Sequence, residues 1–267
     1  MLAFPPLALA LCGLESLYPA NDQGLLAAAP WVRSIGFRAL QLNGAAVGLR
    51  ARDLTRTARK DVAAVLKRTG LELSGIDLWI PPEHFADPAH ADRAAAAVVA
   101  AIELAADLRR FVMQDHPVSV DVILGRPGSP PPDRELLSAI ETQADRCNVR
   151  IADHALPRTQ AAGGATISPL GIGLDPAAVL LTGGDPIKEA TTLGSRLAAA
   201  RLSDARAGVR VSITDDGRGG GLDLQHYAVA LHSSGFAGHV VADVRALADP
   251  GAGARAAAET WKVQTPP

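Results

Sequence analysis

Residues Leu71–Leu108 read LELSGIDLWIPPEHFADPAHADRAAAAVVAAIELAADL, and this stretch decides the fold. Its first part, Leu71–Ile80, is a short apolar run that is typical of a buried strand. A Pro-Pro loop follows, and Ala91–Leu108 is then an alanine-rich segment that predicts a helix. A buried strand followed by such a helix is the repeating unit of parallel α/β proteins.

The same strand–helix unit recurs along the whole chain, with no change of composition between the two halves. The predicted strands are Leu7–Cys12, Phe37–Asn43, Leu71–Ile80, Val118–Gly125, Val149–Ala155, Gly171–Asp175, Ala198–Asp204 and His239–Val244. The predicted helices are Gly24–Ser34, Leu54–Arg68, Ala91–Leu108, Asp133–Arg146, Leu222–Ser234 and three stretches opened by Asp175-Pro176, Asp185-Pro186 and Asp249-Pro250. Eight such units match a closed barrel better than an open, doubly wound sheet. The sequence therefore predicts an α/β protein with a single domain, residues 1–267, folded as a (β/α)8 TIM barrel with a closed parallel sheet.

Two segments fit this pattern less well. Arg109–Pro117 either extends the third helix or forms an extra strand, and Leu156–Ser168 has no periodicity and is expected to be a loop.

Composition excludes several classes of protein. The hydrophobic share of 48% is ample for a large core, and the net charge of −2 argues against a protein that coats nucleic acid. The apolar N-terminus has no lysine or arginine before Arg33, so it lacks the charged region of a signal peptide, and no run of about 18 apolar residues could span a membrane. Two cysteines, Cys12 and Cys147, are expected to be buried thiols in a reducing compartment. We therefore expect a cytoplasmic protein whose partner is a small molecule, not nucleic acid or a membrane; the oligomeric state stays open.

Polar residues follow the predicted strands where a barrel places its active site, at the C-terminal ends. They are Glu83 and His84 after strand three, Arg126 after strand four, Asp153 and His154 at strand five, Asp175 at strand six, Arg201 and Asp204 at strand seven, and Asp243 and Arg245 at strand eight. Four aspartates thus come from four consecutive units, and converging carboxylates repel one another unless a cation or an arginine lies among them. An oxygen-rich cluster with a histidine suits a hard divalent metal such as magnesium or manganese.

Each aspartate also has a structural interpretation. Asp175 precedes a proline at a helix start, so N-capping is as well supported as metal binding, and Asp204 could equally fix a turn. Asp243 lies in an apolar strand, where an unpaired carboxylate is costly, so it requires a partner such as a metal, Arg201 or Arg245. Asp153 and His154 are adjacent, so only one of them can point into the barrel.

A glycine-rich stretch precedes the seventh helix, in ITDDGRGGGLDLQHYAVAL, Ile213–Leu231. It lacks the lysine and the spacing of a P-loop and does not match the dinucleotide-binding pattern. Arg218 with Gly219–Gly221 could contact an anionic substrate, or the glycines could supply flexibility alone.

The order of several motifs resembles the sugar phosphate isomerase/epimerase family with the xylose isomerase-like barrel. The similar stretches are GFRALQLN, GLELSGIDLWIPPEHFADP, CNVRIADHA, GIGLDPAAVL, ARLSDA and GRGGGLDLQHYAVALHSSGFAGHVVADV, which span almost the whole chain. The resemblance implies a metal site made of Glu on strand five, Asp on strand six, His on strand seven and Glu on strand eight. This chain departs from it, with Asp153 or His154, Asp175, Arg201 and Asp243 at those places. A guanidinium cannot bind a metal, and its charge could instead neutralise the aspartates and replace the ion.

Two functions follow from the resemblance. In the first, the chain is an isomerase or epimerase of a sugar or sugar phosphate, with Asp153 and Asp243 as the acid/base pair. A divalent metal (Mn, Mg or Zn) would then be held by Asp175 with Asp153, His154 and Asp243, and His84 or His154 would replace the missing histidine. In the second, the barrel has lost the metal and binds an anionic small molecule or a protein partner. Arg201, Arg218 and Arg245, with His84, are the expected substrate-binding residues. Nucleic-acid repair is the weakest alternative, because the charge is unsuited and the histidine-rich site of such enzymes is not visible.

Overall fold

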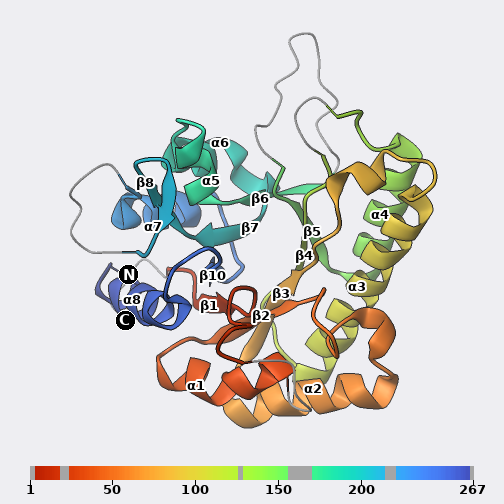
Figure 1. The fold of residues 1–267 in the computed structure, drawn as a ribbon, viewed down its shortest axis with the longest axis horizontal. Coiled ribbons are helices and arrows are strands. Elements are labelled where there is room, and N and C mark those ends of the chain that lie inside the picture. Colours follow the sequence, from red (N-terminus) through yellow and green to blue (C-terminus); the bar gives the residue numbers. More distant parts are fainter. Residues whose placement is uncertain (1–3, 19–23, 126–128, 156–169, 214–220, 265–267) are drawn as a thin grey trace.

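Parallel strands close into a barrel that is surrounded by helices (Figure 1). The computed structural model describes residues 4–18, 24–125, 129–155, 170–213 and 221–264. The barrel strands are β1 (Leu7–Ala10), β2 (Ala39–Asn43), β3 (Glu72–Asp77), β4 (Ser119–Val122), β5 (Arg150–Asp153), β6 (Gly171–Leu174), β7 (Leu197–Leu202) and β10 (Val240–Ala242). Their order around the barrel is β1-β10-β7-β6-β5-β4-β3-β2, and every neighbouring pair is parallel. The predicted closed parallel barrel is thereby confirmed.

Helices connect successive strands on the outside of the barrel (Figure 1). They are α1 (Ala29–Ser34), α2 (Arg56–Thr69), α3 (Ala91–Val112), α4 (Arg134–Cys147), α5 (Pro176–Leu181), α6 (Pro186–Leu193), α7 (Leu224–Ser233) and α8 (Pro250–Gln264), with short 3-10 turns at Gly24–Ala28, Ala51–Asp53, Pro82–Phe85 and Gly194–Arg196. The capping residues explain several of the boundaries. Side chains of Asp175 and Asp185 accept backbone N–H groups at the starts of α5 and α6, each followed by the predicted proline. Gly70 ends α2 with a φ of 67°, a left-handed conformation that glycine adopts without strain.

Of the two alternatives for Arg109–Pro117, the structure contains the helix extension: α3 continues to Val112 and ends at Met113 with a φ of 63°. One other element was not expected. A small antiparallel hairpin, β8 (Asp204–Arg206) with β9 (Val209–Val211), lies where only a strand end and a loop were expected. Both turn residues, Ala207 and Gly208, have positive φ. An Asn-Gly pair commonly marks such a hairpin turn in a sequence, whereas Ala-Gly is a weaker indication of it.

Several small side chains form two clusters of their own, separate from the main hydrophobic core. Ala8, Ala10, Ala39 and Val241 form one small cluster, and Ala152, Ala198 and Ala199 form another. The main core contains the large buried side chains Tyr227, Phe37 and Phe85.

Two further expectations concern the burial of the two cysteines and the absence of a membrane-spanning helix. Cys12 is buried, Cys147 is half-buried rather than buried, and neither forms a disulfide. In the part of the chain that the structure describes, no helix has the length and apolar character needed to cross a membrane. The expected loop Leu156–Ser168 lies outside the described residues.

Candidate functional site

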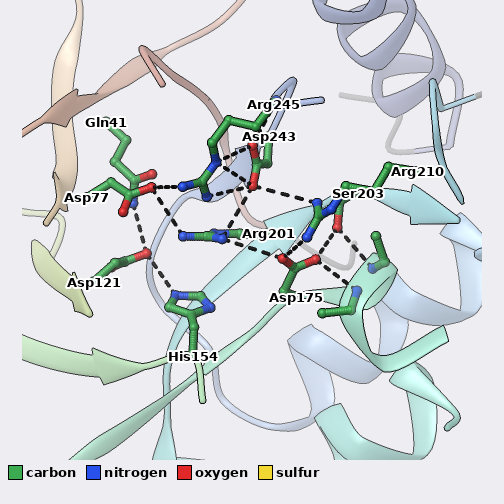
Figure 2. Close-up of polar contacts among 12 residues, drawn as sticks. Gln41, Asp77, Asp121, His154, Asp175, Arg201, Ser203, Arg210, Asp243 and Arg245 are labelled. Atoms are coloured by element: carbon green, nitrogen blue, oxygen red, sulfur yellow. Dashed lines mark hydrogen bonds and ion pairs between the residues drawn. The ribbon is translucent and has the colours of Figure 1, made fainter. Parts of the chain in front are cut away.

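A buried arginine, Arg201 on β7, lies among three aspartates at the C-terminal ends of the strands (Figure 2). Its Nη2 lies 3.2 Å from Oδ2 of Asp77, at the end of β3. Its Nη1 lies 3.4 Å from Oδ2 of Asp175 and 3.3 Å from Oδ2 of Asp243, which follow β6 and β10. None of these four side chains is more than 8% exposed. The guanidinium therefore joins three carboxylates from three different strands.

Two further arginines complete this network from its outer side. Arg245 contacts both oxygens of Asp243, with Nε 3.0 Å from Oδ1 and Nη2 2.8 Å from Oδ2, and its Nη1 lies 2.9 Å from Oδ2 of Asp77. Arg210, on the hairpin strand β9, donates from Nη2 to Oδ2 of Asp175, and its Nη1 lies 3.8 Å from Oδ2 of Asp243. Their side chains are 33% and 23% exposed, so they form the part of the network that solvent can reach.

Local structure holds Asp175 and Arg201 in place. Oδ1 of Asp175 accepts from the N–H of Ala178 in the first turn of α5 and from the hydroxyl of Ser203 at 2.7 Å. The carboxylate therefore caps a helix and pairs with arginine, and the two roles proposed for it from sequence do not exclude each other. The hydroxyl of the fully buried Tyr227 donates to the carbonyl of Arg201 at 3.0 Å, which attaches α7 to β7.

A second polar group, centred on Asp121 of β4, lies beside the first (Figure 2). Oδ2 of Asp121 accepts from Nε2 of Gln41 at 2.9 Å and lies 2.9 Å from Nε2 of His154. The hydroxyl of Ser119 donates to Oδ1 of Asp121 at 2.6 Å. His154 packs directly over Gly173 of β6, where an added Cβ would lie 2.2 Å from its Nε2. A glycine is therefore required at this position of β6.

Neighbouring arginines and hydrogen bonds favour the ionised form of three of these aspartates, Asp175, Asp243 and Asp121. Burial alone would raise the pKa of Asp175, but the positive charges of Arg201 and Arg210 outweigh it and hold this pKa well below its usual range. Burial likewise opposes ionisation of Asp243 and Asp121, yet Arg201 and Arg245 lower the pKa of Asp243, and the hydrogen bond from His154 lowers the pKa of Asp121. The carboxylates raise the pKa of Arg245 in turn, against the effect of burial.

A divalent metal does not fit this network. Asp77, Asp175 and Asp243 contribute three negative charges, and Arg201, Arg210 and Arg245 contribute three positive charges, so a further cation has no net charge to neutralise. A guanidinium has only N–H donors and no lone pair for a metal, and the guanidinium of Arg201 already lies among the carboxylates that would be ligands. No chemical step at this end of the barrel is therefore assigned to a metal.

The four expected metal ligands are not brought together. Of the adjacent pair, His154 reaches Asp121, whereas Oδ1 of Asp153 accepts the backbone N–H groups of Leu124 and Ala155 at 3.1 and 3.0 Å. The alternation of side chains along a strand accounts for this difference. Asp175 and Asp243 do share partners, and these are arginines: both carboxylates lie beside Arg201 and beside Arg210.

The remaining expected residues have other positions. Asp204 does not join the network, because its Oδ1 accepts the N–H groups of Ala205 and Leu222, both at 2.8 Å. This approach requires Gly221, since a Cβ there would lie 2.5 Å from Asp204 Oδ2. His84 is half-buried and stacks on His90, with ring centroids 4.5 Å apart. Arg126 and Arg218 lie outside the described residues.

Six members of the two polar groups were not expected from sequence: Gln41, Asp77, Ser119, Asp121, Ser203 and Arg210. Asp77 and Asp121 each interrupt an apolar strand, which is the signal that identified Asp243, so the same argument could have found them. Arg210 lies on a three-residue strand of an unexpected hairpin and had no such signal.

Comparison with known proteins shows the family of the chain. The family model described as "Xylose isomerase-like TIM barrel" matches residues 29–263. A solved structure of an L-ribulose 3-epimerase is 15% identical, with a TM-score of 0.69 over 98% of this chain and 94% of the other. A D-psicose 3-epimerase, solved in the presence of D-fructose, is 12% identical, with a TM-score of 0.64 over 97% of this chain and 96% of the other. A xylose isomerase-like barrel protein from Mycobacterium smegmatis, solved with magnesium, is 12% identical, with a TM-score of 0.64 over 98% and 97% of the two chains. At such identities the likeness shows the fold alone. A search of curated proteins gave no match.

Proposed function

The chain belongs to the xylose isomerase-like TIM barrel family, and on that premise we propose that the C-terminal end of its barrel binds a sugar or sugar phosphate without a metal ion. The observation that carries the proposal is the position of Arg201, whose guanidinium contacts Asp77, Asp175 and Asp243 at 3.2–3.4 Å. A fixed side-chain cation thus provides the positive charge that converging carboxylates need.

The lowered pKa values of Asp175 and Asp243 argue against proton transfer by these two carboxylates. A general base is most effective when its pKa lies near the working pH. The arginines instead hold the pKa values of Asp175 and Asp243 below the usual range, which makes these carboxylates weak bases. The neighbouring His154 is only 2% exposed at its side chain, so it does not reach a substrate in this conformation. Ligand binding is therefore better supported than isomerisation.

The accessible arginines indicate which ligand is favoured. Arg245 and Arg210 use some of their N–H groups on aspartates and remain 33% and 23% exposed. Guanidinium groups bind phosphate and carboxylate through charged hydrogen bonds and also donate to hydroxyls. Of two structures with the same fold, one is described as solved in the presence of D-fructose and the other as a complex with D-allulose. We infer a sugar-like ligand, with a sugar phosphate or sugar acid favoured over a neutral sugar.

Calorimetric titration of chelator-treated protein tests this proposal. D-fructose 6-phosphate, D-gluconate and D-fructose are the probes, and binding of an anionic probe is expected to be unchanged by added EDTA. Arg245→Met is expected to weaken binding of the anionic probe at least about tenfold, because the variant lacks one charged hydrogen bond to it. Arg255→Met, on the exposed side of α8, is the matched control and is expected to bind like the unaltered chain.

Either of two results would overturn the proposal. One is the absence of binding for all three probes. The other is manganese-dependent interconversion of D-fructose or its phosphate with an epimer, followed by proton NMR.

A further inference from the structure

A second polar cluster lies at the opposite, N-terminal end of the barrel and plays no part in the site described above. Glu72 begins β3, His116 precedes β4, and His239 precedes β10. Nδ1 of His116 lies 2.7 Å from Oε2 of Glu72, and Nε2 of His239 lies 3.2 Å from the same oxygen. One ligand atom from each of the three residues lies within 4.8 Å of the others. Residues more than 40 positions apart in sequence are thus brought around one small volume.

The buried histidine lacks the hydrogen bonds that its position demands. The side chain of His239 is 1% exposed, and within the described parts of the chain neither ring nitrogen has a hydrogen-bond partner. Oε2 of Glu72 likewise has no hydrogen bond of acceptable geometry, despite its short distances to the two rings. Native proteins seldom leave buried polar groups unpaired, because such a group has given up its hydrogen bonds to water and gained none in return. Among the described residues, the two ring nitrogens of His239 and Oε2 of Glu72 therefore have no hydrogen-bond partner.

We propose that Glu72, His116 and His239 together bind one zinc ion. Two imidazoles and one carboxylate form a donor set that zinc accepts in a tetrahedral site, with water as the fourth ligand. A hard ion such as magnesium would instead prefer oxygen ligands throughout. A zinc ion would provide the missing partner both for a nitrogen of His239 and for the Glu72 carboxylate.

The surroundings suit a bound ion. Glu72 and His116 are 35% and 40% exposed at their side chains, so an ion can reach the cluster from solvent. The site joins β3 to β10, which are separated in the barrel by β1 and β2, so zinc would brace the bottom of the barrel across its opening.

Zinc titration of the full chain, made without an affinity tag and treated with a chelator, tests the proposal. Calorimetry is expected to show one zinc ion per chain, and thermal unfolding is expected to shift upward with zinc because the ion binds only the folded state. His239→Gln and His116→Gln are each expected to weaken zinc binding at least roughly 100-fold. Loss of a residue that only orients a metal ligand typically weakens metal binding 10–100-fold, and loss of the ligand itself has a larger effect.

Two control variants separate this site from other histidines and from the opposite end of the barrel. His226→Gln removes an exposed histidine that pairs with Asp223 at 2.7 Å, and Asp243→Asn alters the arginine network. Both are expected to bind zinc like the unaltered chain. If His239→Gln does not fold, Glu72→Gln serves in its place, because Glu72 is partly exposed. The proposal is overturned if the chain binds no zinc, or if binding survives the loss of His116 and of either Glu72 or His239.

Discussion

Nη1 of Arg201 lies 3.3 Å from Oδ2 of Asp243, across the boundary between the neighbouring strands β7 and β10. The same nitrogen lies 3.4 Å from Asp175, and Nη2 of Arg201 reaches Asp77. One guanidinium thus holds three strand ends together. Because this cation is a side chain of β7, only a substitution removes it, and the three buried aspartates then lose their common partner.

Replacing Arg201 with methionine is expected to destabilise the protein strongly. Asp77, Asp175 and Asp243 would lose their common partner while buried, and breaking a buried pair from one side costs about 3–5 kcal/mol. Urea unfolding monitored by circular dichroism measures the change. Arg255→Met, an exposed control, is expected to stay within about 0.5 kcal/mol of the unaltered chain. Equal stability of the two variants would show that the network is not needed for folding.

Acid is expected to destabilise the protein through the same carboxylates. The pKa of Asp175 in the folded state lies below its value in the unfolded chain, about 3.9. Its contribution to stability is therefore complete above pH 4 and is lost as the pH falls toward the folded pKa, because the unfolded state then binds the extra proton.

The slope of unfolding free energy against pH, measured between pH 5 and about pH 2.5, checks this expectation. Asp175→Asn is expected to reduce the slope below pH 4 by up to one proton, which corresponds to ~1.4 kcal/mol per pH unit. Arg255→Met, which removes no carboxyl group and lies on the exposed side of α8, is the control and is expected to leave the slope below pH 4 unchanged. An identical slope in Asp175→Asn would mean that Asp175 has an ordinary pKa.

Gly173→Ala is expected to disrupt the Asp121–His154 contact. A Cβ at Gly173 would lie 2.2–2.4 Å from three ring atoms of His154, which is too close for any unaltered packing. Overpacking of a core typically costs about 1–3 kcal/mol, and the displaced imidazole would leave Asp121. Thermal unfolding and the His154 ring signals in NMR are the measurements. Gly125→Ala has no atom within 4 Å of the new Cβ and is expected to be neutral; a neutral Gly173→Ala would contradict the packing.

The fold could be predicted from sequence because the apolar runs and helix caps repeat along the chain. Asp175-Pro176 and Asp185-Pro186 mark the starts of α5 and α6, since capping is a local interaction. The ends of strands were less certain: β3 ends at Asp77, although the apolar run continues to Ile80. Periodicity does not reveal where pairing with the neighbouring strand stops.

The site was predicted in part. The argument that a carboxylate in an apolar strand needs a partner identified Asp243 and its partners Arg201 and Arg245, and the structure contains both contacts. Which of Asp153 and His154 points inward depends on the register of β5, which sequence alone does not determine. The contact between Arg210 and Asp175 depends on how the β8–β9 hairpin folds over the barrel, and the Glu72–His116–His239 cluster forms only when distant strands close the barrel.

Manganese binding by Arg201→His tests most directly whether Arg201 has taken the place of a metal. The resemblance to the isomerase and epimerase family implies a histidine at this position of strand seven, so R201H restores a ligand between Asp175 and Asp243. Both chains would carry His239→Gln to remove the other candidate site, and free manganese would be counted by electron paramagnetic resonance. We expect no bound manganese with Arg201 present and one ion per chain in R201H. One tightly bound manganese in the chain that retains Arg201, lost on Asp243→Asn, would contradict the account.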